Sequence, residues 1–241
     1  MNKRRTLLAA SLGLVAVAAA ATVTDIVVEH KVEHRVAGTA ACRLDTHETV
    51  SVGLDSRLAG LRALTGTVGT VRINASGVRR QGTELDVAAS LHDVSTDGRT
   101  SGGTATATVA YGQLAERLPA GADGLTPGTD GKHLVLTGTV GSLGLPVTVT
   151  TTLTTTAHAV TVAPSTVSVL GQTLSVDDLS SLPAAAGLAG RLGPRTVDIG
   201  TLPAGARLTG AHATADGLAL DFRLAPAAAG RTGGAAASCA L

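Results

Sequence analysis

The sequence predicts an α+β domain in which a mostly antiparallel sheet packs around or against apolar helices. Three observations lead to this fold class. The chain is rich in threonine and has 30 glycines in 241 residues, which is typical of many strands and turns. Several segments alternate apolar and polar residues, as half-buried strands do. Other segments repeat leucine and alanine at helical spacing, which predicts helices with one apolar face.

The N-terminus has the order of an export signal. Lys3, Arg4 and Arg5 precede residues 7–23, a stretch without charge. The small residues at 18–21 suit a signal peptidase, while the apolar run is close to the roughly 20 residues that span a bilayer. We therefore expect residues 1–28 to form a signal peptide or a membrane anchor. Either way, the rest of the chain lies outside the plasma membrane or is secreted into the cell envelope.

Residues 29–224 are expected to form one domain, and its first half begins with two kinds of helix. Residues 25–36 place valines four apart among charges, which predicts a membrane-proximal helix. Leu54, Leu58, Leu61 and Leu64 then fall on one helical face, and the glycines at 66 and 69 end that helix. Strands follow at 71–74, 84–91 and 104–109, and residues 111–118 form a further helix that contains Leu114 and Leu118.

The second half of the domain is expected to be mostly sheet. Residues 121–131 read as a Gly/Pro-rich connection. Strands are predicted at 134–140, 146–157, 158–162, 166–170 and 197–199, with threonines solvated on one face and apolar residues covered on the other. Asp177 and Asp178 begin a helix, and Leu182 and Leu192 lie on a second one. Asp216-Gly217 joins a final hairpin at 207–224, and residues 225–241 are an Ala/Gly-rich tail.

Charge and aromatic content argue against a nucleic-acid partner. The chain has 19 Lys+Arg against 18 Asp+Glu, and its aromatic residues are Tyr111 and Phe222 alone. Proteins that bind nucleic acids are usually more basic and often stack bases on aromatic rings. The composition therefore offers neither a basic patch nor a stacking platform.

Catalytic motifs are missing from the sequence, with one weak exception. It has no G-x-S-x-G, Walker, C-x-x-C or S-x-x-K pattern, so we expect no catalytic residue, metal or cofactor. His30, Glu33 and His34 fit H-x-x-E-H, the inverted zinc-peptidase pattern, but a third ligand and a cleft are not evident. A secreted metallopeptidase is thus a minor alternative to a charged, solvated linker helix. The remaining histidines are expected at the surface; they are His47, His92, His133, His158 and His212.

Two cysteines, Cys42 and Cys239, lie near opposite ends of the exported part. An oxidising exterior permits a disulfide between them, which we expect, and two free thiols are the alternative.

Several segments in the same order resemble one known family. They are the strand from Val71 to Ile73, residues 85–91, the turn into a helix at 109–115, the Leu-Pro-Ala-Gly-Ala-Arg-Leu-Thr-Gly stretch at 202–210, and residues 215–218. Over residues 30–224 the chain resembles the LmeA-like phospholipid-binding proteins of the actinobacterial envelope. The resemblance implies a non-enzymatic protein whose curved sheet and helices form a tubular lipid-binding-like fold around acyl chains, with phospholipid and the plasma membrane as partners. Residues 51–56 lack the aromatic segment that family members often carry.

If that resemblance holds, seven leucines line the acyl-chain groove: Leu54, Leu58, Leu61, Leu114, Leu118, Leu182 and Leu192. Burial of each lipid CH₂ would then contribute about 0.8 kcal/mol. The same leucines could instead form a sealed core. Arginine suits a phosphate head group, and the candidates are Arg62, Arg72, Arg79 and Arg80. An exported structural or adhesion-type β domain without a ligand is the alternative function.

Overall fold

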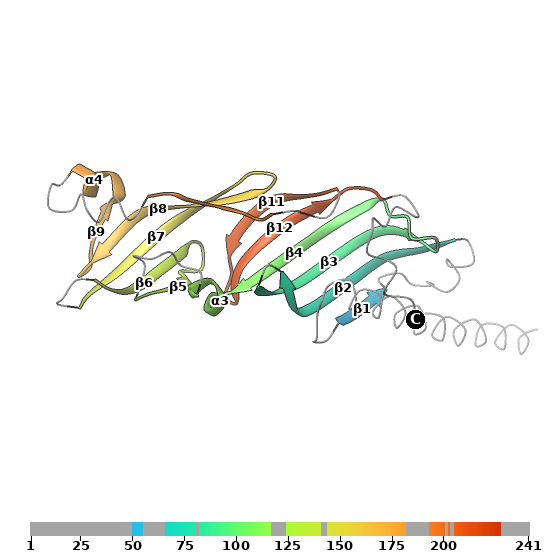
Figure 1. Ribbon diagram of the computed structural model, residues 1–241, viewed down its shortest axis with the longest axis horizontal. Coiled ribbons are helices and arrows are strands. Elements are labelled where there is room, and N and C mark those ends of the chain that lie inside the picture. The colour runs from blue at the N-terminus through green and yellow to red at the C-terminus, as the bar shows by residue number, and fades with distance from the viewer. Residues whose placement is uncertain are drawn as a thin grey trace, which may run out of the picture.

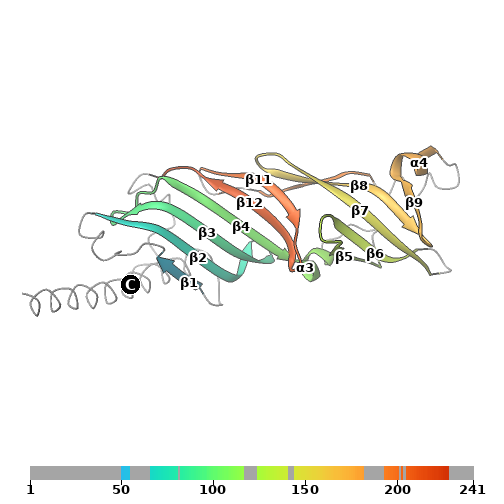
Figure 2. The ribbon, with the colours of Figure 1, turned by 180° about the vertical axis from the view of Figure 1, so that it is seen from behind.

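The described part of the chain is built from two antiparallel sheets placed end to end. The computed structural model describes residues 50–54, 66–80, 82–116, 124–140, 144–181, 193–200, 202 and 205–227. Within these ranges each sheet has six strands, and neither sheet closes on itself. Figures 1 and 2 show the two sheets following one another along the long axis of the molecule. The prediction of a mostly antiparallel sheet is confirmed, but the helices described are few and short.

The first sheet combines the first four of the described strands with the last two. Its order is β1 (Val50–Leu54), β2 (Thr67–Arg80), β3 (Thr83–Ser95), β4 (Gly102–Ala110), β12 (Gly217–Leu224) and β11 (Ala206–Ala213). The predicted final hairpin is therefore present, and it lies against β4 (Figure 1). Beyond β12, Ala227 exchanges two backbone hydrogen bonds of 3.1 Å with Thr100.

The second sheet contains the middle of the chain. Its strands are β5 (Leu125–Thr129), β6 (Leu134–Val140), β7 (Leu145–Thr155), β8 (Ala159–Val169), β9 (Gln172–Ser175) and β10 (Arg195–Asp198). The order is β10-β8-β7-β6-β5, and β9 also pairs with β8. Val147, Val149 and Val167 form its core. Thr151 shares their face and is buried, and its hydroxyl donates to the carbonyl oxygen of Leu134 at 2.8 Å. The alternate threonines Thr152 and Thr154 are exposed, as predicted.

A short helix and one turn join the sheets. Helix α3 (Tyr111–Ala115) begins where predicted, directly after β4, and the chain then enters the second sheet. The turn between β7 and β8 reaches back toward β11, where the backbone N–H of Leu208 donates to the carbonyl oxygen of Ala157 at 3.2 Å. The end of the first sheet is thereby held against the second.

Several sequence predictions are wrong in detail. Leu54 does not begin a helix but ends β1, because Val50, Val52 and Leu54 alternate and pair with β2. The predicted connection at 121–131 contains β5, whose Pro127 is tolerated in an edge strand. The two short strands predicted at 158–170 are one strand, β8. Its Pro164 lies between the segments that pair with β10 and with β9, next to a bulge at Ser165 in β8 itself, so the proline interrupts no ladder along that edge.

Helix α4 (Val176–Ser181) confirms the helix start predicted at Asp177 and Asp178. Ser175 caps it: its hydroxyl oxygen accepts from the N–H of Asp178 at 3.0 Å and donates to the Asp178 carboxylate at 2.6 Å. Helix α4 and β9 lie at the end of the molecule away from β1 (Figures 1 and 2).

Some expectations fall outside the described residues. They are the N-terminal helix and its signal or anchor, the linker helix with His30, Glu33 and His34, the helix of Leu58, Leu61 and Leu64, the helix at 182–192, and the pair Cys42 and Cys239. Among the helices that are described, none has the length and apolar character needed to cross a membrane.

Candidate functional site

One face of the first sheet is apolar across all six strands. Residues alternate between the two faces of a strand, and the register brings the apolar positions of neighbouring strands opposite one another. Three complete cross-strand rows result. From β1 to β11 they are Val52, Ile73, Ala89, Ala105, Phe222, Leu208; Leu54, Val71, Leu91, Gly103, Leu224, Ala206; and Val50, Ala75, Val87, Ala107, Leu220, Ala211. We call these residues the apolar face.

Most of the apolar face is only half-buried. Val71, Ala75, Ala206 and Leu208 are buried, whereas the remaining members of the three rows retain intermediate exposure. A sealed core would bury its large side chains almost completely. The face therefore presents accessible apolar surface, which is where a lipid chain gains free energy by leaving water.

A strip of small residues runs along the middle of this face. Strand β4 contributes Gly103, Ala105 and Ala107, whereas the neighbouring β12 contributes the larger Leu220 and Phe222. From Gly103 to Ala107 the strip is about 14 Å long at about 3.4 Å per residue. One leaflet of a bilayer hydrocarbon core is about 15 Å thick, half of about 30 Å. An extended acyl chain could thus lie along β4 and contact the backbone closely.

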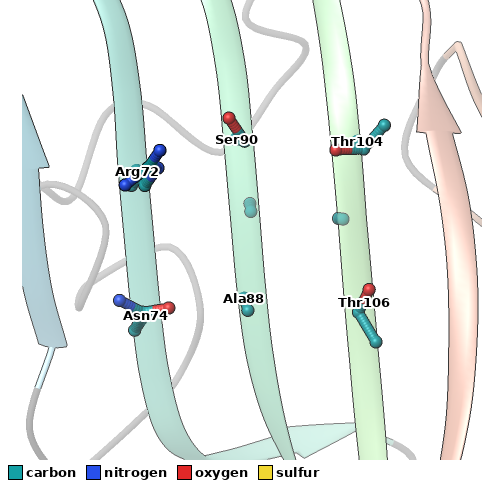
Figure 3. Close-up of a pocket in the computed structure, with 8 residues that line it drawn as sticks. Arg72, Asn74, Ala88, Ser90, Thr104 and Thr106 are labelled. Atoms are coloured by element: carbon teal, nitrogen blue, oxygen red, sulfur yellow. The ribbon is translucent and has the colours of Figure 1, made fainter. Parts of the chain in front are cut away.

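The opposite face of the same sheet is polar. Arg72, Ser90 and Thr104 are adjacent in one cross-strand row on this side. With Asn74 and Thr106 they surround a hollow of about 220 Å³ over Ala88, which Figure 3 shows on three neighbouring strands. Arg72 therefore does not lie on the apolar face. The other head-group candidates on β2, Arg79 and Arg80, are exposed at its end, and Arg62 is outside the described residues.

The predicted lipid-binding leucines are not gathered at one place. Leu54 lies on the apolar face, opposite Val71 at the β1 edge of the first sheet. Leu114 is half-buried in α3, which packs against β5 and β4. Leu58, Leu61, Leu118, Leu182 and Leu192 lie outside the described residues. The apolar face instead draws three residues from each of the six strands of the first sheet. The alternation within β2, β3 and β12 was visible in the sequence, whereas the pairing of the strands was not.

The histidines form no cluster in the described part of the chain. His92, His158 and His212 are exposed and His133 is half-buried, while His47 lies outside the described ranges. His212 has its Nδ1 3.1 Å from Oδ2 of Asp221. No group of three or more potential metal ligands occurs among the described residues.

These features define a class of protein: an open, mostly antiparallel β structure with a long accessible apolar sheet face. The chain belongs to the LmeA-like phospholipid-binding family, whose model matches residues 23–223. This match confirms the resemblance seen in the sequence. Neither the curated proteins nor the solved structures contain a match to the chain.

Proposed function

We propose that this protein binds phospholipids without catalysing a reaction, and that acyl chains lie against the apolar face of the first sheet. The observation that carries the proposal is the set of three cross-strand rows, which are apolar on all six strands yet mostly half-buried. Membership of a phospholipid-binding family supplies the ligand class.

Binding is driven by removal of the lipid chain and the sheet face from water together. Each CH₂ buried contributes about 0.8 kcal/mol, so a chain covered along much of its length gains several kcal/mol. The small side chains of Ala105 and Ala107 let the chain approach the sheet, and the larger Phe222 and Leu220 flank it. Specificity for a particular chain is not expected from such a surface, because dispersion and burial are non-directional.

The proposal extends to the location of the protein. The basic residues and apolar run at residues 3–23 support export, with residues 1–28 acting as a cleaved signal or a retained anchor. In that compartment the sheet and the remaining chain would form a tubular shelter for lipid in the cell envelope, closed by a disulfide between Cys42 and Cys239.

Bulk added to the small-residue strip tests the proposal. Ala105→Phe and Ala107→Phe fill the strip, and Thr108→Phe is the matched control because it adds similar bulk to the opposite face of the same strand. Native mass spectrometry and lipid extraction on the purified full chain measure bound phospholipid, and far-UV circular dichroism checks the fold. We expect the wild type and Thr108→Phe to carry lipid and both alanine variants to lose most of it.

Two outcomes contradict the proposal. If folded Ala105→Phe and Ala107→Phe retain as much phospholipid as Thr108→Phe, the chains do not lie on this face. If the wild type carries no phospholipid and takes up none from vesicles, the protein is a β domain without a lipid ligand.

A further inference from the structure

A row of cationic and hydroxyl side chains crosses the polar face of the first sheet. Arg72 on β2 is opposite Ser90 on β3, Ser90 is opposite Thr104 on β4, and Thr104 is opposite Arg223 on β12. Arg207 on β11 extends the row beyond Arg223. Two hydroxyls thus lie between two arginines on neighbouring strands, and we call these five residues the arginine row.

The centre of the arginine row borders the hollow over Ala88. Because Ala88 has a short side chain, Arg72, Ser90 and Thr104 line an opening of about 220 Å³ together with Asn74 and Thr106 (Figure 3). The guanidinium of Arg72, the amide NH₂ of Asn74 and the hydroxyls of Ser90 and Thr104 can donate hydrogen bonds. The Thr106 hydroxyl instead donates to Asp221. The hollow therefore suits an acceptor-rich, negatively charged group.

The spacing of the strands allows two arginines to contact one small anion. Strands β2 and β12 are three strand spacings apart, about 14 Å at 4.7–4.9 Å each. Arginine side chains extend far from the backbone, so Arg72 and Arg223 can approach a ligand over Ser90 and Thr104 from opposite sides. Guanidinium groups match phosphate oxygens in geometry and charge.

The charge balance around Arg223 also favours an anion. Arg207 and Arg223 are directly opposite, and like charges in that position destabilise a sheet. Asp221, two residues from Arg223, is engaged elsewhere: it accepts from the Thr106 hydroxyl at 2.9 Å and pairs with His212 at 3.1 Å. In the described part of the chain, no carboxylate lies within ion-pair distance of Arg207 or Arg223.

We propose that the arginine row binds a phosphate group, as a phosphomonoester or phosphodiester. Its oxygens accept from the guanidinium groups of Arg72 and Arg223 and from the hydroxyls of Ser90 and Thr104. The site lies on the face opposite the apolar face. It therefore takes a second phosphate rather than that of the lipid whose chains lie on β4, and it goes beyond the proposed function. The source is either a soluble phosphate compound or a head group at a bilayer surface.

Titration of the full chain with inorganic phosphate by calorimetry tests the soluble source. Arg72→Gln and Arg223→Gln remove the two arginines, and Arg79→Gln is the matched control because it makes the same charge change on β2 outside the hollow. We expect saturable binding by the wild type and Arg79→Gln, and a loss of about tenfold in affinity for each of the other variants.

Vesicle co-sedimentation tests the bilayer source. Phosphatidylcholine vesicles with and without phosphatidylglycerol are compared, and inorganic phosphate is added as a competitor. Binding that needs phosphatidylglycerol, falls in Arg72→Gln and Arg223→Gln, and is displaced by phosphate assigns the site to a head group. The proposal is overturned if neither probe binds, or if both variants match Arg79→Gln in both assays. Lipid retention by the apolar face is measured separately, so the failure of one proposal leaves the other intact.

Discussion

The hydroxyl of Tyr111 donates a hydrogen bond to the backbone carbonyl oxygen of Thr214 at 2.7 Å. Tyr111 begins α3, where the chain leaves the first sheet for the second, and Thr214 lies in the turn between β11 and β12. That turn is closed by the N–H of Thr214, which donates to the carbonyl oxygen of Gly217 at 2.8 Å. The contact therefore fastens the C-terminal hairpin to the segment that joins the two sheets, across 103 residues of sequence.

Removal of the Tyr111 hydroxyl should destabilise the protein. In Tyr111→Phe the ring remains and the carbonyl of Thr214 loses its side-chain donor, so the free energy of unfolding should fall by about 0.5–1.5 kcal/mol. Urea denaturation followed by far-UV circular dichroism measures the change. Tyr111→Leu also removes ring packing and should cost more. Equal midpoints for wild type and Tyr111→Phe would show that water replaces the hydroxyl at no cost.

The ionisation of Tyr111 makes the stability of the folded protein depend on pH, in a direction that follows from its pKa. Burial raises the pKa of its phenol above the usual 10.0. The folded state therefore holds this proton more tightly than the unfolded state. The shifted pKa of Tyr111 therefore stabilises the folded state fully below pH 10.0, and this stabilisation is lost as the pH rises through the raised pKa. The chain has one tyrosine and no tryptophan, so near-ultraviolet tyrosinate absorbance reports this residue alone. Native protein should titrate at higher pH than protein in urea, and coincident curves would refute the burial effect.

Asp130 makes the stability of the folded protein depend on pH in the opposite direction, because its pKa is lowered. Its Oδ1 accepts from the backbone N–H of His133 at 2.6 Å and of Lys132 at 2.8 Å, in the turn between β5 and β6. These hydrogen bonds, that of His133 first, lower the pKa of Asp130 from 3.8 to about 2. The stabilisation is present above pH 3.8 and is lost as the pH falls toward about 2.

Asp130→Asn should accordingly lower the thermal unfolding midpoint at neutral pH and leave it nearly unchanged near pH 2. Differential scanning calorimetry at both pH values measures this difference. Asp216→Asn is the control, because Asp216 lies in the turn between β11 and β12 and makes no hydrogen bond or ion pair among the described residues. If the unfolding midpoint of Asp130→Asn were lower than that of the wild type by the same amount at both pH values, the charge of Asp130 would contribute nothing to stability.

Local alternation predicted the strands well, whereas boundaries between competing patterns were predicted poorly. Leu218, Leu220, Phe222 and Leu224 alternate along the sequence, which predicts that they share one face, and the structure places them on one face of β12. Leu54 satisfied both a helical spacing with later leucines and a period of two with Val50 and Val52. Pairing with β2 favours the strand, and such a long-range contact leaves no trace in the local sequence.

The candidate site could not be assembled from the sequence, because it depends on which strands become neighbours. Ala105 and Phe222 are 117 positions apart in the chain and directly opposite in the sheet. The same pairing places Arg223 beside Thr104 and so completes the arginine row. Sequence reasoning named Arg72 as one of four candidate head-group ligands by residue type alone, and only the register shows that it lies on the face opposite the apolar rows.

The Asp216-Gly217 pair illustrates how a correct prediction can rest on a different physical cause. An Asp-Gly pair is a hairpin signal because glycine adopts positive φ freely. Gly217, however, is not among the glycines with positive φ, and it already pairs with Ala110 as the first residue of β12. Glycine is required there by space: a Cβ at Gly217 would lie 2.1 Å from the carbonyl oxygen of Val109. Because that oxygen belongs to the backbone of β4, it cannot move without disturbing the sheet.

Gly217→Ala should therefore destabilise the protein by about 1–3 kcal/mol, the usual cost of overpacking. Gly53→Ala is the matched control, because Gly53 also lies in a strand of the first sheet but has no positive φ, and a Cβ added to it would meet no atom within 4 Å. That change should be neutral or slightly stabilising, since alanine restricts the unfolded chain more than glycine does. Urea denaturation of both variants separates the two explanations of Gly217. A loss confined to Gly217→Ala assigns the glycine to the close approach of β12 to β4, whereas similar small effects in both variants would mean that the strands can separate enough to admit a methyl group.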